Sequence, residues 1–120
     1  MPNPGAFVAA FALQKTKRIG ACVIQKVKVG HIVKQEYQEY EFPLEIMLQC
    51  ADAKINPDLI LQNIIEATKE PKVVMSDYNN PYHCYIENYA VTLTKRINTL
   101  KGIETQVTVT ALGHGIRMRS

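Results

Sequence analysis

Three histidines and three cysteines are the side chains in this sequence best suited to nucleophilic, acid–base or metal chemistry. They are His31, His83, His114, Cys22, Cys50 and Cys84. Only His83 and Cys84 are adjacent, yet a nucleophile and its base normally meet across a fold. Because no CxxC or similar ligand spacing occurs, we predict no catalytic residue, no metal and no cofactor. A Cys–His pair assembled by the fold and a zinc site built from the cysteines are minor alternatives to plain packing.

The length of 120 residues suits one domain with a single hydrophobic core. The apolar runs are much shorter than the roughly twenty residues that cross a bilayer, so we expect no membrane span and no signal peptide. An odd number of cysteines argues against a secreted disulfide framework and predicts a reducing, intracellular compartment, either cytoplasm or nucleus. The net charge of +3 permits a nucleic-acid partner without requiring one.

Two segments begin with the same helix-capping signature, an asparagine followed by a proline. Asn3–Pro4 is predicted to open a short helix with a basic C-terminal end before Gly20. Asn56–Pro57 is predicted to open a second helix that ends before Pro71. A third helix is predicted over Ile86–Gly102 from the spacing of its apolar residues. These residues are Ile86, Ala90, Leu93, Ile97 and Leu100, and Lys95, Arg96 and Lys101 lie toward the C-terminal end.

Alternating apolar and polar residues predict several half-buried strands. The strands are Gln25–Val29, Tyr40–Leu48, the brief apolar segment Lys72–Ser76, and Val107–Ala111. Gly30–Gln38 is expected to form a hairpin arm, and Asp77–Pro81 a turn. Because Pro43 has no backbone N–H, its strand is predicted to be an edge or bulged strand. The carboxylates Glu39, Glu41 and Glu45 fit a solvated strand face better than acid–base roles.

The segments Asn80–Ile86 and Val107–Ile116, with the predicted helix between them, resemble the first half of an Alba domain. The best single motif is the Ala-Leu-Gly-His-Gly-Ile sequence of residues 111–116. In that family the chain continues into a second helix and two hairpin strands, which here resemble the N-terminal part of the sequence. The resemblance therefore implies a circularly permuted domain, or the same segments exchanged between two chains. The alternative is an unrelated α/β sandwich of helices on a mixed sheet.

The resemblance implies an α/β fold, an α+β sandwich with a mixed four-stranded sheet and two helices in permuted order. We expect one domain over residues 1–120. Within it, residues 1–52 would supply a helix and a strand hairpin, and residues 72–120 a strand, a helix and a strand. Residues 53–71 would be an added connecting helix.

The resemblance also implies binding of RNA or DNA, mainly through the phosphate backbone, within a ribonucleoprotein or chromatin particle. Asn79 and Asn80 replace the basic residues that the family carries in its first loop, so a dispersed basic surface is expected instead. Glycine amides would approach phosphates, and tyrosines would stack on unpaired bases. The predicted nucleic-acid-binding residues are Lys15, Lys17, Arg18, Lys26, Lys28, Lys34, Tyr78, Asn79, Asn80, Tyr82, Gly113, His114, Gly115, Arg117 and Arg119. Plain solvation of the charges and packing of the tyrosines are the alternatives.

A second hypothesis is a structural subunit that binds protein through a sheet face or the Tyr40–Leu48 edge strand, without nucleic acid. Because Alba-like domains are usually dimers, the expected partner is a second copy or a similar domain. Neither hypothesis includes a small-molecule substrate or enzymatic activity. The charge distribution separates the two: a basic face favours nucleic acid, whereas scattered lysines and an apolar face favour assembly. The basic residues that decide are Lys26, Lys28, Lys34, Arg117 and Arg119.

Overall fold

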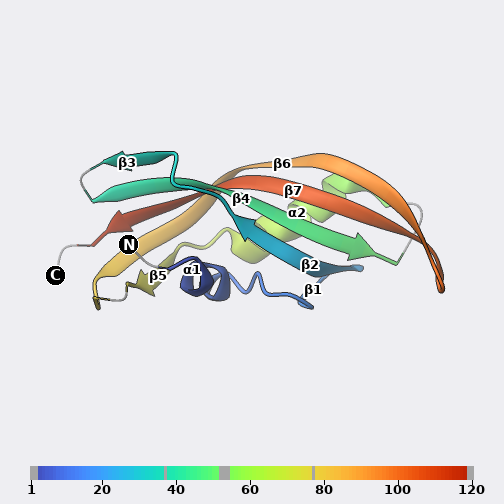
Figure 1. The fold of residues 1–120 in the computed structure, drawn as a ribbon, viewed down its shortest axis with the longest axis horizontal. Coiled ribbons are helices and arrows are strands. Elements are labelled where there is room, and N and C mark those ends of the chain that lie inside the picture. The colour runs from blue at the N-terminus through green and yellow to red at the C-terminus, as the bar shows by residue number, and fades with distance from the viewer. Residues whose placement is uncertain (1–2, 37, 52–54, 77, 119–120) are drawn as a thin grey trace.

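A single antiparallel sheet dominates the structure, a computed structural model that describes residues 3–36, 38–51, 55–76 and 78–118. The strands are β1 (Arg18–Ile19), β2 (Cys22–Val29), β3 (Lys34–Glu36), β4 (Glu39–Cys50), β5 (Lys72–Met75), β6 (Pro81–Thr99) and β7 (Gly102–Arg117), and the helices are α1 (Pro4–Ala10) and α2 (Pro57–Thr68). The strand order is β1-β2-β4-β7-β6-β5, and β3 continues along β4 beyond the end of β2. The sheet curls into a half-barrel with both helices on one side (Figure 1).

This architecture corrects the predicted α/β sandwich. Among the described residues the sheet has seven strands, not four, and every pairing is antiparallel. The two expected halves, residues 1–52 and 72–120, do not form a permuted sandwich, because β4 lies between β2 and β7 in one continuous sheet. The four predicted strands are present as β2, β4, β5 and β7, but β7 is much longer than the predicted Val107–Ala111, because it runs over 16 residues from Gly102 to Arg117.

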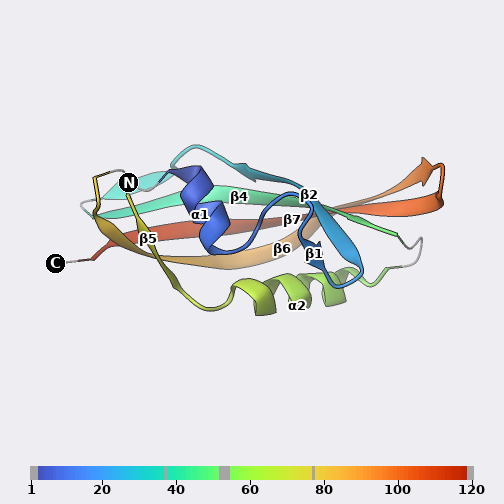
Figure 2. The same ribbon diagram turned by 90° about the horizontal axis from the view of Figure 1, so that it is seen from below.

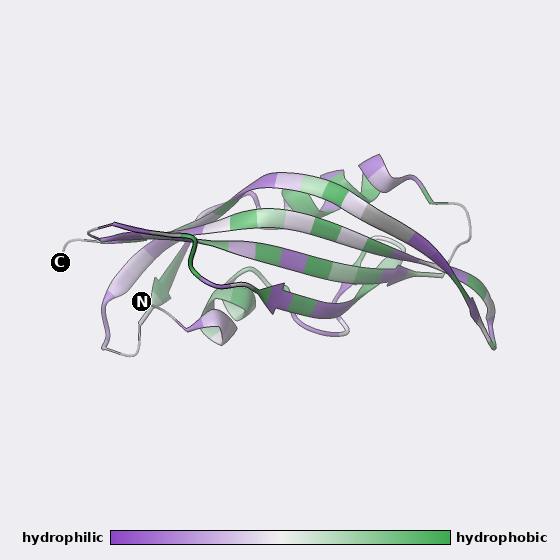
Figure 3. Ribbon diagram, turned by 45° about the horizontal axis from the view of Figure 1, so that its top comes forward, coloured by the Kyte–Doolittle hydropathy of each residue, from purple (hydrophilic) through white to green (hydrophobic). Residues whose placement is uncertain are grey.

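The concave face of the sheet carries the core. Along β4 the even-numbered residues from Tyr40 to Cys50 are buried, while the odd-numbered residues lie on the convex face. All of β4 pairs with β7 without a bulge, so the odd-numbered residues of β7 from Thr105 to Gly115 share the concave face. Hydrophobic and hydrophilic residues therefore alternate along the strands (Figure 3). A period of two lets one sheet bury one face and leave the other in water.

Both helices cover the concave face (Figure 2), and both begin where the sequence predicts. The Asn3 side chain accepts a hydrogen bond from the Ala6 backbone N–H at 2.7 Å. The Asn56 side chain accepts one from the Asp58 N–H at 3.0 Å. Each contact satisfies a backbone donor that would otherwise have no partner inside the helix. Within the described residues, neither helix is both long enough and apolar enough to cross a bilayer.

The first helix is shorter than predicted and has no basic end. It stops at Ala10, and Ala12 adopts a left-handed backbone with φ of 56°. This turn allows Leu13, which is 1% exposed, to enter the core. Lys15, Lys17 and Arg18 consequently lie in the following loop and in β1, beyond the end of the helix.

The predicted third helix is wrong, because residues 86–99 belong to the long strand β6. β-branched residues are frequent in this segment and favour an extended backbone. Two bulges, one between Glu87 and Ala90 and another a few residues later, shift which face each residue occupies. Together the two bulges give the apolar residues of this strand a spacing that resembles the spacing in a helix. Ile86 nevertheless lies on the concave face, whereas Ala90 and Ile97 lie on the convex face.

β4 is a central strand and not the predicted edge strand, despite Pro43. β7 pairs along one side of it, and on the other side β2 gives way to β3. The Pro43 carbonyl accepts a hydrogen bond from the Gly30 N–H at 2.8 Å. Gly30 directly follows the end of β2, so Pro43 lies where this neighbouring segment stops pairing with β4. A missing N–H is tolerated at such an interruption. Gly30 is needed here because a Cβ on it would lie 2.5 Å from the Pro43 ring.

Cys22 and Cys50 form a disulfide between facing positions of β2 and β4. They are 28 residues apart, so no local spacing predicts the bond, and the argument for a reducing compartment loses its basis. The zinc alternative fails as well, because these two sulfurs are bonded to each other. Cys84 is free and lies on the concave face, whereas His83 and His114 lie on the convex face, so they form no catalytic pair. Burial raises the pKa of the Cys84 thiol to about 11.

Thiol titration checks these assignments. At about pH 8, we expect an aromatic disulfide reagent to label no cysteine in the native protein, because the Cys84 thiol is buried and protonated. Denaturation without reductant exposes one thiol, and reduction exposes all three. The Cys84→Ala variant provides the control, since its unreduced denatured form has no thiol to label. Fast labelling of the native protein, or three thiols without reductant, would contradict the structure.

Candidate functional site

The predicted basic surface is spread over separate parts of the molecule. Lys15 and Lys17 lie in the loop before β1, Arg18 in β1, Lys26 and Lys28 on the convex side of β2, Lys34 in β3, and Arg117 at the end of β7. Arg119 lies outside the described residues. Acidic residues occur between them, and Glu45 faces Lys28 in the β2–β4 ladder. These described residues therefore do not form one continuous basic face.

The turn between β5 and β6 brings together some of the predicted polar residues. The Ser76 hydroxyl accepts hydrogen bonds from the backbone N–H groups of Tyr78 and Asn80, at 3.3 and 3.1 Å. The Asn80 side-chain oxygen accepts one from Arg117 Nη2 at 3.2 Å. The Tyr78 side chain is 85% exposed, and Asn79 has a left-handed φ of 58°. The fold thus gathers a tyrosine, two amides and a guanidinium at the end of the sheet.

The predicted glycine loop is not a loop, because Gly113 and Gly115 lie inside β7 and are buried. Aromatic rings from β4 lie directly over them. A Cβ on Gly113 would lie 2.5 Å from the Phe42 ring, and a Cβ on Gly115 would lie 2.2 Å from the Tyr40 ring. Tyr82 packs edge-on against Tyr40, with ring centroids 5.4 Å apart. These glycines make room for rings inside a strand and form no open loop, and Tyr82 is half-buried.

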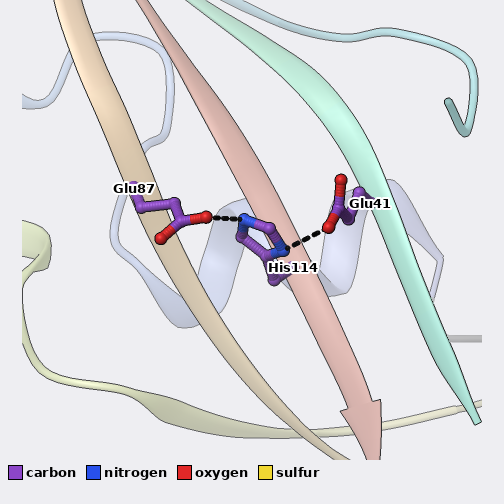
Figure 4. A network of polar contacts seen from close by, with 3 residues as sticks. All are labelled: Glu41, Glu87 and His114. Carbon is purple, nitrogen blue, oxygen red and sulfur yellow. Dashed lines mark ion pairs between the residues drawn. The ribbon is translucent and has the colours of Figure 1, made fainter. Parts of the chain in front are cut away.

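His114 lies on the convex face between two carboxylates (Figure 4). Its Nε2 atom is 2.6 Å from the Glu87 carboxylate, and its Nδ1 atom is 3.4 Å from Glu41. The ring stacks on Tyr85 with centroids 4.6 Å apart, and the side chain is only 7% exposed. The Nε2 contact lacks hydrogen-bond geometry. Because both ring nitrogens face carboxylates, this cluster links β4, β7 and β6 and directs neither nitrogen at a substrate.

An apolar cleft opens between α1 and the segment that follows β2. Its volume is about 420 Å³, and it is lined by Pro4, Phe7, Val29, Gly30, His31, Ile32, Tyr40 and Phe42. The Phe7 and Phe42 rings meet edge to face at 4.7 Å between centroids. The Tyr40 hydroxyl is buried without a hydrogen bond, and desolvation raises its pKa well above the usual tyrosine value. Because few polar groups line the cleft, it favours an apolar occupant.

At the other end of the sheet, β6 and β7 run past the end of β4 (Figure 1). The last residue pair between β4 and β7 is Cys50 with Thr105, so Ile97–Glu104 forms a two-stranded ribbon, here called the arm. The Gln49 side-chain amide donates a hydrogen bond to the Glu104 carboxylate at its root. The turn is closed by the Thr99 hydroxyl, which donates to the Gly102 carbonyl at 2.8 Å.

The tip of the arm exposes apolar side chains among basic ones. Leu100 is fully exposed and Ile103 is 49% exposed. Lys101 shares the turn with Leu100, while Lys95 and Arg96 precede the arm on β6. An isolated two-stranded ribbon is marginally stable in water, and this one exposes two large apolar side chains.

The arm, the cleft and the carboxylates around His114 were not predicted from the sequence. The arm had a usable local signal, because β-branched residues surround a Leu-Lys-Gly turn, but the bulges in β6 hid the period of two. The cleft had no such signal, because it joins residues near positions 4, 30 and 40. No family model, curated protein or solved structure matched this chain.

A double-mutant cycle tests the packing role of the glycines. Gly113→Ala places a methyl group against the Phe42 ring, so we expect a loss of about 1–3 kcal/mol in the free energy of unfolding. Phe42→Leu vacates part of that space, so the double variant should lose less than the sum of the two single variants. Chemical denaturation measures all four proteins. Strictly additive losses, or no loss in Gly113→Ala, would contradict the packing role.

Proposed function

We propose that the protein is a structural subunit that associates with further copies through the arm, Ile97–Glu104. One observation carries this proposal: Leu100 and Ile103 are exposed at the tip of a ribbon that has no β4 beside it. Burying a leucine side chain is worth about 1.5–3 kcal/mol, and no described residue of the same chain covers Leu100. A contact with another chain supplies that burial.

The distribution of charge supports assembly over binding through a basic face. The lysines of β2 alternate along the chain with uncharged residues, and Lys28 faces Glu45 of β4. Arg117, at the far end of β7, already contacts Asn80. The edge strand β5 adds two exposed apolar side chains, Val73 and Met75, at 58% and 50% exposure. Scattered charges with exposed apolar groups are typical of a protein-binding surface.

Sedimentation velocity over a concentration series tests self-association. We expect the wild type to associate, and Leu100→Ser to weaken the association about 10- to 100-fold, because about 1.5–3 kcal/mol of burial is lost. Leu59→Ser is the matched control, since Leu59 is a leucine that is 54% exposed and belongs to α2, outside the arm. A wild type that stays monomeric throughout, or a Leu100→Ser variant that associates normally, would refute the proposal.

Nucleic-acid binding is the second candidate, and the basic residues of the arm favour it. Lys95 and Arg96 lie at its root and Lys101 at its tip, on a ribbon of the kind that enters a DNA groove. An apolar residue at the end of such a ribbon can wedge between bases. This interface differs from the predicted dispersed surface, because its charges come from the segment expected to be helical.

Fluorescence anisotropy tests the second candidate with an RNA hairpin, a single strand and a DNA duplex, each across a salt series. If the arm binds phosphate, Lys101→Gln should reduce the salt slope by about 0.7–0.9. Lys69→Gln is the control, because Lys69, the residue after α2, forms an ion pair with Glu66 at 2.8 Å. Absence of binding to all three probes at low salt would exclude this candidate.

A further inference from the structure

We propose that the apolar cleft beside α1 binds a small amphipathic anion, a molecule with an apolar chain that ends in a carboxylate. The chain would lie against the aromatic rings on the concave face, and the carboxylate would lie at the mouth beside His31. This inference goes beyond the proposed self-association and uses a different part of the molecule, because no residue of the arm lines the cleft.

The cleft has the size and the lining of a ligand site. Its volume of about 420 Å³ lies within the range of small-molecule pockets. The rings of Phe7, Tyr40 and Phe42 form its inner wall, and none of these residues is more than 5% exposed. An apolar cavity offers water few hydrogen bonds, so an apolar chain is favoured there over water.

The backbone on both sides of the opening is held in place. The Gly30 N–H donates to the Pro43 carbonyl at 2.8 Å, and the Val33 N–H donates to the Glu41 carbonyl at 2.9 Å. His31 and Ile32 lie between these two contacts, outside the paired residues of β2 and β3, and line the cleft. The cleft is therefore a fixed feature of the fold, and a ligand needs no segment to open.

The mouth of the cleft is marked by the exposed residues of its lining. Pro4 and His31 are exposed, whereas the aromatic rings behind them are buried. Among the described lining residues, only His31 has a polar side chain that is exposed. A neutral imidazole carries one N–H donor, whichever ring nitrogen holds the proton. The lining thus pairs an apolar interior with a hydrogen-bond donor at the entrance, which matches an apolar chain with a terminal carboxylate.

The charges on the two faces of the sheet favour a negative head group. By register, every described glutamate of the strands lies on the convex face, away from the cleft; these are Glu36, Glu39, Glu41, Glu45, Glu87 and Glu104. Lys34 faces Glu41 there. The other described carboxylates belong to α2 or the loop after it, and none lines the cleft. Arg117 lies on the concave face opposite Tyr82, whose ring packs against Tyr40.

The segment that forms most of the lining is itself basic. Residues 1–35 contribute Pro4, Phe7 and residues 29–32 to the cleft and contain no Asp or Glu. Their basic residues are Lys15, Lys17, Arg18, Lys26, Lys28 and Lys34. These charges lie on different parts of the surface, so they raise the positive potential around the cleft without adding a second head-group contact. An anion is therefore attracted to this end of the chain and a cation is not.

Isothermal titration calorimetry of the full chain tests the inference with ligands that share one chain length. The probes are decanoate, decanol and decylammonium, each below the concentration at which it forms micelles. We expect decanoate to bind about 10-fold more tightly than decanol, because the hydrogen bond to a charged group is lost in the alcohol. Decylammonium should bind most weakly. Hexanoate has a shorter apolar chain and should bind about 10-fold or more weakly than decanoate.

Three substitutions locate the site. His31→Ala should reduce the decanoate affinity about 10-fold and leave the decanol affinity unchanged. Ile32→Glu should weaken both ligands about 10-fold or more, because it places a charge in the lining. Val33→Glu is the matched control, since Val33 is 65% exposed and does not line the cleft, and its effect should be below about twofold at physiological salt.

Far-ultraviolet circular dichroism checks that each variant is folded. If Ile32→Glu does not fold, Pro4→Glu replaces it, because Pro4 is an exposed lining residue in the first turn of α1, where a carboxylate suits the helix. Pro4→Glu should weaken decanoate and strengthen decylammonium, since its charge lies at the mouth.

Three results would overturn the inference. The first is a wild type that binds none of the probes, and the second is equal affinity for decanoate and decanol with no effect of His31→Ala. The third is decanoate binding that neither Ile32→Glu nor Pro4→Glu changes, which would place the ligand elsewhere. Because the arm does not line the cleft, these results do not depend on whether the protein associates.

Discussion

The uninterrupted pairing of β4 with β7 is the constraint on which the rest of the structure depends. All 12 residues of β4 have a partner in β7, from Glu39 with Ile116 to Cys50 with Thr105. Because this ladder contains no bulge, a single alternation assigns one apolar face and one polar face to the centre of the sheet. The helices then pack on the apolar, concave face. The disulfide, the His114 cluster and the arm also take their positions from this register.

The register of β4 against β7 also determines which side chains pack closely on the concave face. Gly113 and Gly115 carry no side chains, so the rings of Phe42 and Tyr40 lie directly against the backbone of the neighbouring strand. Aromatic rings placed over strand glycines cover the backbone and help to fix the pairing. The same rings line the cleft beside α1, together with Phe7. A segment that looks like a flexible glycine loop is therefore a rigid part of the core.

The two ends of the sheet carry two unlike surfaces, the arm and the cleft. At one end of the sheet, β7 extends beyond the end of β4 and forms part of the arm. Toward the other end, the break between β2 and β3 leaves the cleft uncovered. Among the described residues, β6 has no strand on its outer side beyond Cys84, so this part of β6 is an edge of the sheet. Two bulges and basic residues lie along this edge. Such features discourage uncontrolled pairing of sheet edges.

The sequence by itself determined the elements whose signals are local. The Asn-Pro caps set the starts of both helices, and the alternation in residues 40–48 set a strand, because capping and side-chain direction depend on near neighbours. The tertiary structure alone decided the remainder. Bulges turned a helix-like spacing into β6, and partners on both sides made β4 central despite its proline. Pairing across 28 residues joined the cysteines, and distant segments met to form the cleft. These features depend on which strands lie side by side, and the energy that selects the neighbours is spread over the whole core.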